Sequence, residues 1–248
     1  MPADRAEIGY TPRLQRPLAA WVEDGRLALY DWQQSRRIAT AVAVDRVTAT
    51  NGRLLAQQGA MLYQVELLEL PAGIQAALTP LSNVLPNATC LYDGVAIQDV
   101  LGTWHATVSP RPGTGYVLPL SELAGTQVVN ARYENQVLFV VVARQGSFDR
   151  YCYRFDPEFR SRDLQIERDV SNPELNAVVL ESGVALLLND QGDLELFPNR
   201  PGRPARRIIS DPNLPGSRLF RCETQLLLAC GKTLFSGTLS SSVESAAS

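Results

Sequence analysis

Histidine occurs only once in this 248-residue chain, as His105. Zinc sites and triad-type catalysis usually combine histidine with other groups, so each of those chemistries would depend on this one side chain. His105 lies in an alternating segment, 103–108, and the chain has no Gly-x-Ser-x-Gly nucleophile elbow. We therefore predict an ordinary strand histidine, no catalytic residues and no cofactor.

Long apolar runs, paired cysteines and a leader-like N-terminus are missing as well. The most apolar run, 137–143, has the length of a strand, whereas a membrane-spanning helix needs about 20 apolar residues. Residues 1–5 have none of the apolar character of a signal peptide core. The four cysteines form no Cys-x-x-Cys pair and lie among apolar residues, so we interpret them as buried reduced thiols. These features predict a cytoplasmic protein that contacts no membrane.

The chain also lacks an excess of either charge, because 23 Lys and Arg residues stand against 26 Asp and Glu residues, for a net charge of −3. This balance excludes a dedicated polybasic nucleic-acid binder and a strongly acidic tail. Lys232 is the only lysine, so arginine supplies every other basic side chain. One explanation is codon bias in a GC-rich bacterial genome. The other is a surface suited to bidentate carboxylate or phosphate contacts, which arginine makes and lysine does not.

What the chain does have is a repeat of turns and alternating strands. Short turn motifs that end in glycine each precede a strand-like segment, and their glycines lie 34 to 46 residues apart: Gly25, Gly59, Gly102, Gly146, Gly192 and Gly231. A second set of turns precedes most of these, at 51–52, 93–94, 134–135, 182–183 and 223–224. Asn-Gly and Asp-Gly suit tight hairpins, because both central residues of a type I′ turn need a positive φ. Six units fit this spacing, the first of them short.

Each unit has the pattern of a four-stranded antiparallel meander, with turn signals every 8–12 residues or so. The second strands, at 137–143, 184–188 and 226–229, are nearly continuous in apolar residues. Such a strand needs cover on both faces, and stacking of successive sheets supplies it. A repeated sheet of about 40 residues is typical of a propeller blade. We predict an all-β fold, a β-propeller of about six four-stranded antiparallel blades, with five or seven blades as alternatives.

The segment Asp24-Gly-Arg-Leu-Ala-Leu-Tyr-Asp-Trp32 resembles the third strand of a WD40-type propeller blade. The resemblance covers residues 18–240 as a repeat pattern, with Asp-Trp in one unit only. No unit has the Gly-His dipeptide of WD40 blades, and a single histidine excludes their repeated Asp-His-Ser-Trp network. The resemblance therefore implies propeller architecture and no specific family.

One domain is expected over residues 1–239. Its last unit has the pattern of three strands only, and we expect the N-terminal segment near 6–10 to supply the outer strand that closes this blade. Such a closure would remove an exposed sheet edge. Residues 240–248 form a polar, serine-rich tail that we predict to be disordered.

Carboxylates near the inner strands raise the alternative of an enzyme. Some six-bladed propellers resembling lactonases hold calcium on their axis with Asp, Glu and Asn, and the candidates here are Asp45, Asp93, Asp99, Glu134 and Glu181. Most of them occupy turn positions that favour Asp and Asn for backbone reasons. A calcium site also needs six to eight or so converging oxygens. We therefore predict no metal site and keep a calcium-dependent hydrolase or lactonase-like enzyme as the alternative.

Two groups of residues are candidates for partner binding. The hairpin at 143–150 places Phe148 between Arg144 and Arg150, and arginine and aromatic residues are enriched at interface hot spots. The densest basic cluster contains Arg200 and Arg203. No aromatic residues interleave with this cluster for base stacking, which disfavours nucleic acid.

The pattern as a whole predicts a non-catalytic scaffold for protein–protein interaction. Rigid strands with variable loops suit recognition, and fold alone fixes no chemistry. We expect a rigid subunit or accessory module of a larger bacterial assembly, with another protein as its partner. A carbohydrate-binding or RNA-binding module is the second alternative.

Overall fold

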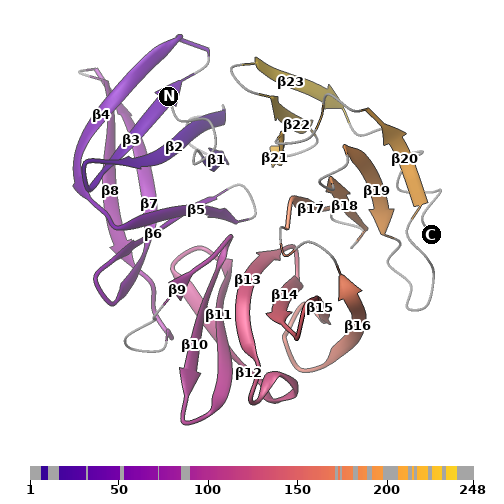
Figure 1. Cartoon of the computed structure of the whole chain (residues 1–248). Coiled ribbons are helices and arrows are strands. Elements are labelled where there is room, and N and C mark those ends of the chain that lie inside the picture. Colours follow the sequence, from indigo (N-terminus) through magenta and orange to yellow (C-terminus); the bar gives the residue numbers. More distant parts are fainter. Residues whose placement is uncertain are drawn as a thin grey trace. The chain divides into compact units, whose positions relative to one another are not determined.

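The computed structural model describes residues 7–10, 17–31, 33–50, 53–71, 73–84, 90–170, 173, 175–180, 184–188, 192–197, 206–211, 214, 217–222, 225–230 and 233–238. Within these ranges the chain forms 23 strands and one short 3-10 turn, η2 (Ser121–Leu123) (Figure 1). No helix in this part of the chain has the length and apolar character that crossing a membrane requires. The backbone contacts fall into two compact units, Asp4–Gly125 and Thr126–Ser248, here called the N-terminal and C-terminal units.

The N-terminal unit contains three four-stranded sheets. Sheet 1 consists of β1 (Glu7–Tyr10), β2 (Pro17–Glu23), β3 (Arg26–Asp31) and β4 (Arg36–Ala43). Sheet 2 consists of β5 (Arg46–Thr50), β6 (Arg53–Gln58), β7 (Met61–Leu70) and β8 (Gly73–Pro80). Sheet 3 consists of β9 (Cys90–Leu91), β10 (Val95–Val100), β11 (Thr103–Arg111) and β12 (Thr114–Leu120).

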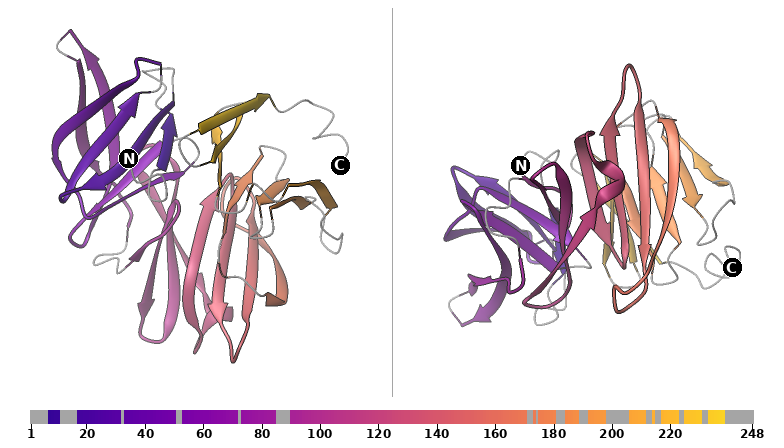
Figure 2. Two further views of the ribbon diagram at one scale, coloured as in Figure 1. Left: turned by 45° about the horizontal axis from the view of Figure 1, so that its top comes forward. Right: turned by 90° about the horizontal axis from the view of Figure 1, so that it is seen from below.

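The C-terminal unit repeats the arrangement. Sheet 4 consists of β13 (Gln127–Glu134), β14 (Val137–Ala143), β15 (Phe148–Phe155) and β16 (Arg162–Val170). Sheet 5 consists of β17 (Ala177–Val179), β18 (Ala185–Leu188), β19 (Asp193–Phe197) and β20 (Arg206–Ser210). Sheet 6 has three strands in the described residues, β21 (Arg218–Cys222), β22 (Gln225–Cys230) and β23 (Thr233–Thr238). In every sheet consecutive strands pair antiparallel and lie side by side (Figures 1 and 2).

The glycine turns predicted from the repeat join the central strands. In sheet 1, Glu23 pairs with Arg26, which leaves a two-residue turn in which Asp24 has φ 49° and Gly25 has φ 70°. Two positive φ angles are the signature of a type I′ hairpin. The equivalent glycines of the next four units have φ between 57° and 83°: Gly59, Gly102, Gly146 and Gly192. Gly231 of the last unit lies outside the described residues.

Apolar faces of neighbouring sheets bury one another within each unit. Leu29 and Leu54 belong to one cluster that joins sheets 1 and 2. Val141 and Val179 share a second cluster between sheets 4 and 5, and Leu219 of sheet 6 completes a third with sheet 5. β14 is buried along all but its last residue, as its continuous apolar sequence predicts. Removal of these faces from water is the main force that stacks the sheets, at about 25 cal/mol per Å² of apolar surface.

Side-chain hydrogen bonds between neighbouring sheets recur at the spacing of the repeat. In each, a backbone N–H of one sheet donates to a side-chain oxygen of the sheet before it, and the partners are 46, 45 and 43 residues apart in sequence. The pairs are Gly94 N to Thr48 Oγ1 (3.0 Å), Val179 N to Glu134 Oε2 (2.9 Å) and Leu219 N to Asn176 Oδ1 (2.8 Å). Val179 and Leu219 lie in β17 and β21, the edge strands of their sheets, where alternate N–H groups have no acceptor within the sheet.

The fold class is the predicted one: an all-β β-propeller type of four-stranded antiparallel blades, with six sheets in the described residues. The N-terminal segment differs from expectation. β1 pairs with β2 as the first strand of sheet 1, with Glu7 opposite Ala20 and Tyr10 opposite Pro17, rather than completing sheet 6. Because β2 is the strand nearest to β1 in the sequence, pairing with it closes a shorter loop and costs less conformational entropy. A single domain over 1–239 stays a prediction, and the tail at 240–248 lies outside the described residues.

Candidate functional site

The hairpin between β14 and β15 forms the base of the candidate site. Val142 pairs with Asp149 and Ala143 with Phe148, which leaves residues 144–147 as the connecting loop. The Arg144 N–H donates to the Ser147 carbonyl over 2.9 Å and closes this loop. The positive φ of Gly146, 82°, makes the reversal of the chain at this point compatible with the strands on either side.

A bulge in β16 brings the side chains of Arg168 and Asp169 to the same loop. Phe148 pairs with Val170 and Arg150 with Glu167, so two steps along β15 lie opposite three along β16. The extra residue disrupts the alternation of side chains in β16, and Asp169 has φ 58°. Bulges re-aim side chains in this way and are common at functional edges of sheets.

Asp149 is the charged centre of the site, and its side chain is fully buried. Its Oδ2 accepts Arg144 Nε at 2.7 Å and Arg168 Nη1 at 3.0 Å. Its Oδ1 lies 3.4 Å from the backbone nitrogen of Asp169. A buried carboxylate is costly unless it is paired and hydrogen-bonded, and here two guanidiniums supply both. We call Asp149, Arg144 and Arg168 the arginine clamp.

A hollow of about 610 Å³ lies beside the clamp. It is lined by Gln127, Ala143, Arg144, Gln145, Ser147 and Asp169. The Ser147 hydroxyl donates to Asp169 Oδ1 over 3.1 Å, which fixes both groups on the wall of the hollow. The clamp arginines remain open to solvent, with 51% of the Arg144 side chain and 53% of the Arg168 side chain exposed. The site therefore combines a buried anchor with exposed, oriented cations.

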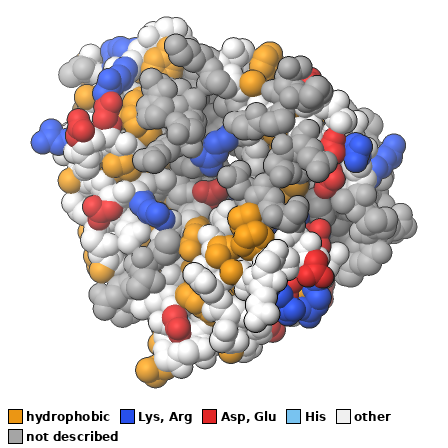
Figure 3. All heavy atoms as spheres, in the orientation of Figure 1, with side chains coloured by type: hydrophobic (Ala, Val, Ile, Leu, Met, Phe, Trp, Pro, Cys, Tyr) orange, Lys and Arg blue, Asp and Glu red, His pale blue; other side chains and the backbone are white. Residues whose placement is uncertain are grey.

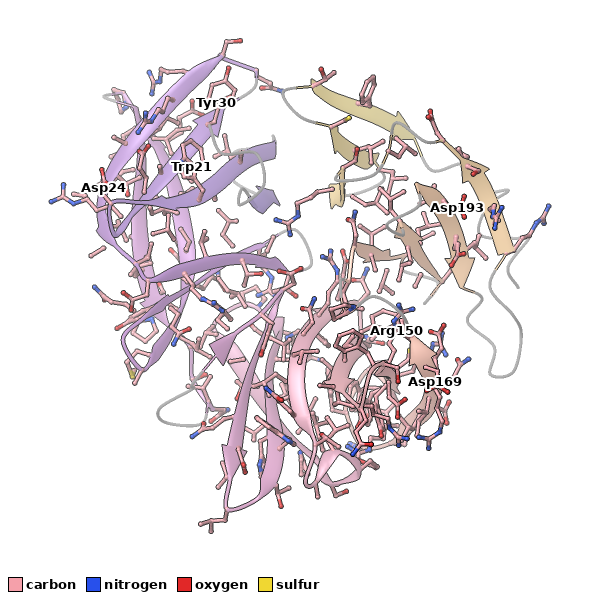
Figure 4. All side chains as sticks on the ribbon, in the orientation of Figure 1. Trp21, Asp24, Tyr30, Arg150, Asp169 and Asp193 are labelled. Atoms are coloured by element: carbon pink, nitrogen blue, oxygen red, sulfur yellow. The ribbon has the colours of Figure 1, made fainter. Side chains whose placement is uncertain are left out.

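The predicted partner-binding residues divide between this surface and the interior. Arg144 lies in the site and is exposed. Phe148 is half-buried and packs against the cluster that contains Val141. Arg150 is buried on β15 (Figure 4). Its Nη1 lies 3.0 Å from Oε2 of the half-exposed Glu167. Arg200 and Arg203 lie outside the described residues.

Sequence reasoning missed Asp149 and Arg168. β15 alternates, with Asp149 on the same face as Tyr151, Tyr153 and Phe155, all buried. A single carboxylate on an otherwise apolar strand face is a signal for a buried ion pair, and this signal was available. Arg168 carried no such signal, because a bulge decides its direction.

His105, Asp45 and Asp99 bond to backbone groups of their own sheets, whereas Glu134 accepts the Val179 N–H of the next sheet. His105 lies in β11 with its Nδ1 3.0 Å from the Thr103 carbonyl, as expected for a strand residue. Asp45 Oδ2 accepts the Gly59 N–H at 2.5 Å, and Asp99 Oδ1 accepts the Gly102 N–H at 2.8 Å. Both bonds cap turns. Among the described residues, no three His, Cys, Asp or Glu side chains gather in a way that could hold a metal ion. Glu181 lies outside these residues.

Two of the four cysteines are described as free thiols. Cys152 is buried in the cluster between sheets 4 and 5, and Cys230 is half-buried. Burial raises the pKa of the Cys152 thiol, while the positive charges of Arg154 and Arg150 oppose this rise. The thiol therefore remains protonated at neutral pH. The side chains of Cys90 and Cys222 lie outside the described part of the chain.

Comparison with known proteins assigns the chain to no family. No family model matches the chain, and no curated protein matches it. Among solved structures, Hsv2 of Kluyveromyces marxianus is similar over 92% of this chain and 79% of its own, with 11% identity and a TM-score of 0.46. Hsv2 of Kluyveromyces lactis covers 85% and 74%, with 12% identity and a TM-score of 0.42. An oligogalacturonate lyase in complex with manganese covers 91% and 75%, with 14% identity and a TM-score of 0.40. Similarity at this level assigns no activity or partner to the chain.

Proposed function

We propose that this chain is a non-catalytic module that binds another protein, and that the surface over the arginine clamp is its contact site. The observation that carries the proposal is that Arg144 and Arg168 are exposed to solvent and at the same time held in place. Both are about half-exposed, yet each is held by the fully buried carboxylate of Asp149. Fixing flexible side chains before binding lowers the entropy that the complex must give up. Arginine is also among the residues most enriched at interface hot spots.

The surroundings of the clamp suit recognition better than catalysis. Asp149 Oδ2 already accepts two guanidinium N–H groups, so this carboxylate orients cations and is poorly placed to take a proton from a substrate. The hollow beside it offers amide, hydroxyl and guanidinium groups within one open wall. Acidic and basic side chains lie close together over sheet 4 in Figure 3, and such mixed charge suits a protein contact better than a uniform polyanion.

We further propose that the chain acts as a rigid subunit or accessory module within a larger bacterial assembly in the cytoplasm. The support is the rigidity of the scaffold under the site. β14 is buried along six of its seven residues, and a carboxylate and an amide of β13 and its turn, Glu134 and Asn135, both bond to the backbone of Val179. A site on rigid strands keeps its geometry with or without a partner.

Affinity capture from extracts of the source organism tests the proposal. The informative variant is R144Q/D149N/R168Q, here called the neutral clamp, because its side chains keep neutral hydrogen-bonding groups and leave no buried charge. The matched control is R160A/R206A, which also removes two exposed arginines from the C-terminal unit. We expect a protein that is captured by the wild-type chain and by the control and is lost with the neutral clamp. Equal capture by all three chains would refute the site, and a wild-type chain that captures nothing would refute the function.

A further inference from the structure

We propose that the arginine clamp binds a carboxylate of its partner, supplied by an Asp or Glu side chain in an exposed segment. This inference rests on the proposed function and names the chemistry of the same surface. A guanidinium carries five N–H donors. In the described contacts Arg144 uses only Nε, and Arg168 uses only Nη1, both toward Asp149. The other donors of these half-exposed groups are available to an incoming acceptor.

The geometry of the clamp fits one planar anion. Because both ion pairs end on the same atom, Asp149 Oδ2, the two bonded nitrogens lie within about 6 Å of each other. We infer that two guanidiniums anchored on one atom can each direct an unused N–H to one oxygen of a second carboxylate, with Arg144 donating from the wall of the hollow. Such charge-assisted bonds are roughly twice as strong as neutral ones, and the fork of arginine gives them direction.

The charge balance favours a carboxylate over a phosphate. Asp149 neutralises one of the two clamp charges, and Asp169 places another carboxylate on the wall of the same hollow. The buried Arg150 adds no net charge, because it is paired with Glu167. The clamp by itself therefore carries one net positive charge, which a single carboxylate would offset, whereas the second charge of a phosphate monoester would face Asp169. Like charges at close range cost affinity and set specificity.

The Asp169 carboxylate predicts which residue types flank the acidic residue in the partner. Asp169 accepts the Ser147 hydroxyl and has further lone pairs directed to solvent or ligand. An N–H or O–H donor next to the acidic residue would find an acceptor there, and a second acidic residue would be repelled. The hollow, at about 610 Å³, has the size of sites that hold a short peptide segment or a small ligand. We therefore expect an isolated acidic residue rather than an acidic run.

Selection from a phage-displayed library of random heptapeptides on the full-length chain tests this inference. We expect enrichment of peptides with one Asp or Glu. A fluorescein-labelled peptide of the most enriched sequence should bind at least tenfold more weakly when its Glu is replaced by Gln. The neutral clamp should weaken binding by a similar factor, and R160A/R206A should leave it unchanged. Selected peptides without an acidic residue, equal binding of the Gln peptide, or no enrichment at all would each overturn the carboxylate assignment.

A gain-of-affinity variant separates this inference from simple loss of folding. Asp169→Asn removes the competing negative charge, keeps an acceptor for Ser147, and suits the positive φ of this position. We expect the acidic peptide to bind about threefold more tightly to this variant. Unchanged or weaker binding would contradict the charge argument. A fluorescein-labelled oligouridine that binds more tightly than the peptide and is released by the neutral clamp would instead assign the site to a nucleic acid. If capture of the partner from extracts survives while acidic peptides fail, the proposed function stands and only the carboxylate chemistry is refuted.

Discussion

Asp193 and Arg207 form in sheet 5 the same kind of pair that Asp149 and Arg168 form in sheet 4. Arg207 Nε lies 3.3 Å from Asp193 Oδ2, and the Asp193 side chain is 5% exposed. In both sheets the carboxylate stands near the start of the third strand, and the arginine comes from a fourth strand whose register is interrupted by one residue. The bulge and the buried carboxylate thus recur together in consecutive sheets. In sheet 4 a second arginine, Arg144 from the hairpin loop, also pairs with the carboxylate.

Removing the two clamp arginines should be non-additive. In Arg144→Ala or Arg168→Ala, the buried carboxylate keeps one partner, and we expect each to destabilise the chain by about 1–2 kcal/mol. In the double variant the buried charge of Asp149 has lost both guanidiniums, and we expect about 3–5 kcal/mol or more. Urea unfolding followed by circular dichroism measures these differences. A double variant whose loss equals the sum of the single losses within about 0.5 kcal/mol would show that Asp149 does not depend on the pair.

A side chain at Gly115 should destabilise the fold. A Cβ built there would lie 2.7 Å from Val84 Cγ1 and 3.0 Å from the Asn83 carbonyl oxygen. The segment after β8 is held against sheet 3 at this point, since the Gly115 N–H donates to the Ser82 carbonyl over 2.7 Å. We expect Gly115→Ala to cost about 1–3 kcal/mol by overpacking.

Gly59→Ala is the matched control for that substitution. Gly59 has φ 57° and nothing within 4 Å of a built Cβ, so its replacement costs only the backbone strain, about 1 kcal/mol. Thermal unfolding of both variants compares them directly. A Gly115→Ala chain as stable as Gly59→Ala would argue against the close approach of this segment to sheet 3.

The turn between β15 and β16 gives a dependence on acid pH. The hydrogen bond from the Ser161 side chain, with backbone N–H groups of residues 158, 160 and 161, lowers the pKa of Asp156 from 3.8 to about 2. A carboxyl whose pKa is lower in the folded state stabilises that state above pH 3.8 and loses this contribution as the pH falls toward 2. We expect the stability difference between wild type and Asp156→Asn to be constant above about pH 5 and to shrink below pH 4.

Titration of the Asp156 carboxyl carbon by nuclear magnetic resonance measures the same effect at its source. The midpoint should lie near pH 2 in the wild type and move upward in Ser161→Ala, because the largest cause of the shift is removed. A wild-type midpoint near 3.8 would contradict the arrangement of the turn.

Chelation separates the proposed function from the calcium-dependent alternative. An ion that binds only the folded state stabilises it by about 3 kcal/mol when present at 100 times its Kd. A module without such an ion should unfold at the same temperature, to about 1 °C, with EDTA and with added calcium. A fall of several degrees in EDTA that calcium reverses would favour the hydrolase alternative.

The sheets were predictable because their signals are local. A turn such as Asp24-Gly25 needs positive φ at both residues, and the alternating segments beside it need one buried face, so each hairpin is encoded within about 20 residues. The pairing of β1 was not predictable in this way. Its sequence specifies an extended strand, but the choice between sheet 1 and sheet 6 depends on contacts far apart in the chain.

The candidate site was half predictable for the same reason. Arg144 stands in, and Phe148 directly follows, a loop whose length and turn residues are visible in the sequence. The position of Arg168 depends on one extra residue in β16, and a single-residue bulge shifts every later side chain to the other face. The burial of Arg150 was predictable from the sequence, because in an alternating strand it shares a face with the apolar residues Phe148 and Cys152.

Site-specific photo-crosslinking in the source organism tests the central claim most directly. A photoreactive amino acid at position 145 stands on the wall of the hollow, and the same residue at the fully exposed Leu101 in the N-terminal unit serves as the control. The proposed function predicts one discrete crosslinked protein from position 145, none from position 101, and loss of that product in the neutral clamp. Crosslinking that is absent at 145, or equal at both positions, would contradict the assignment of this surface to partner binding.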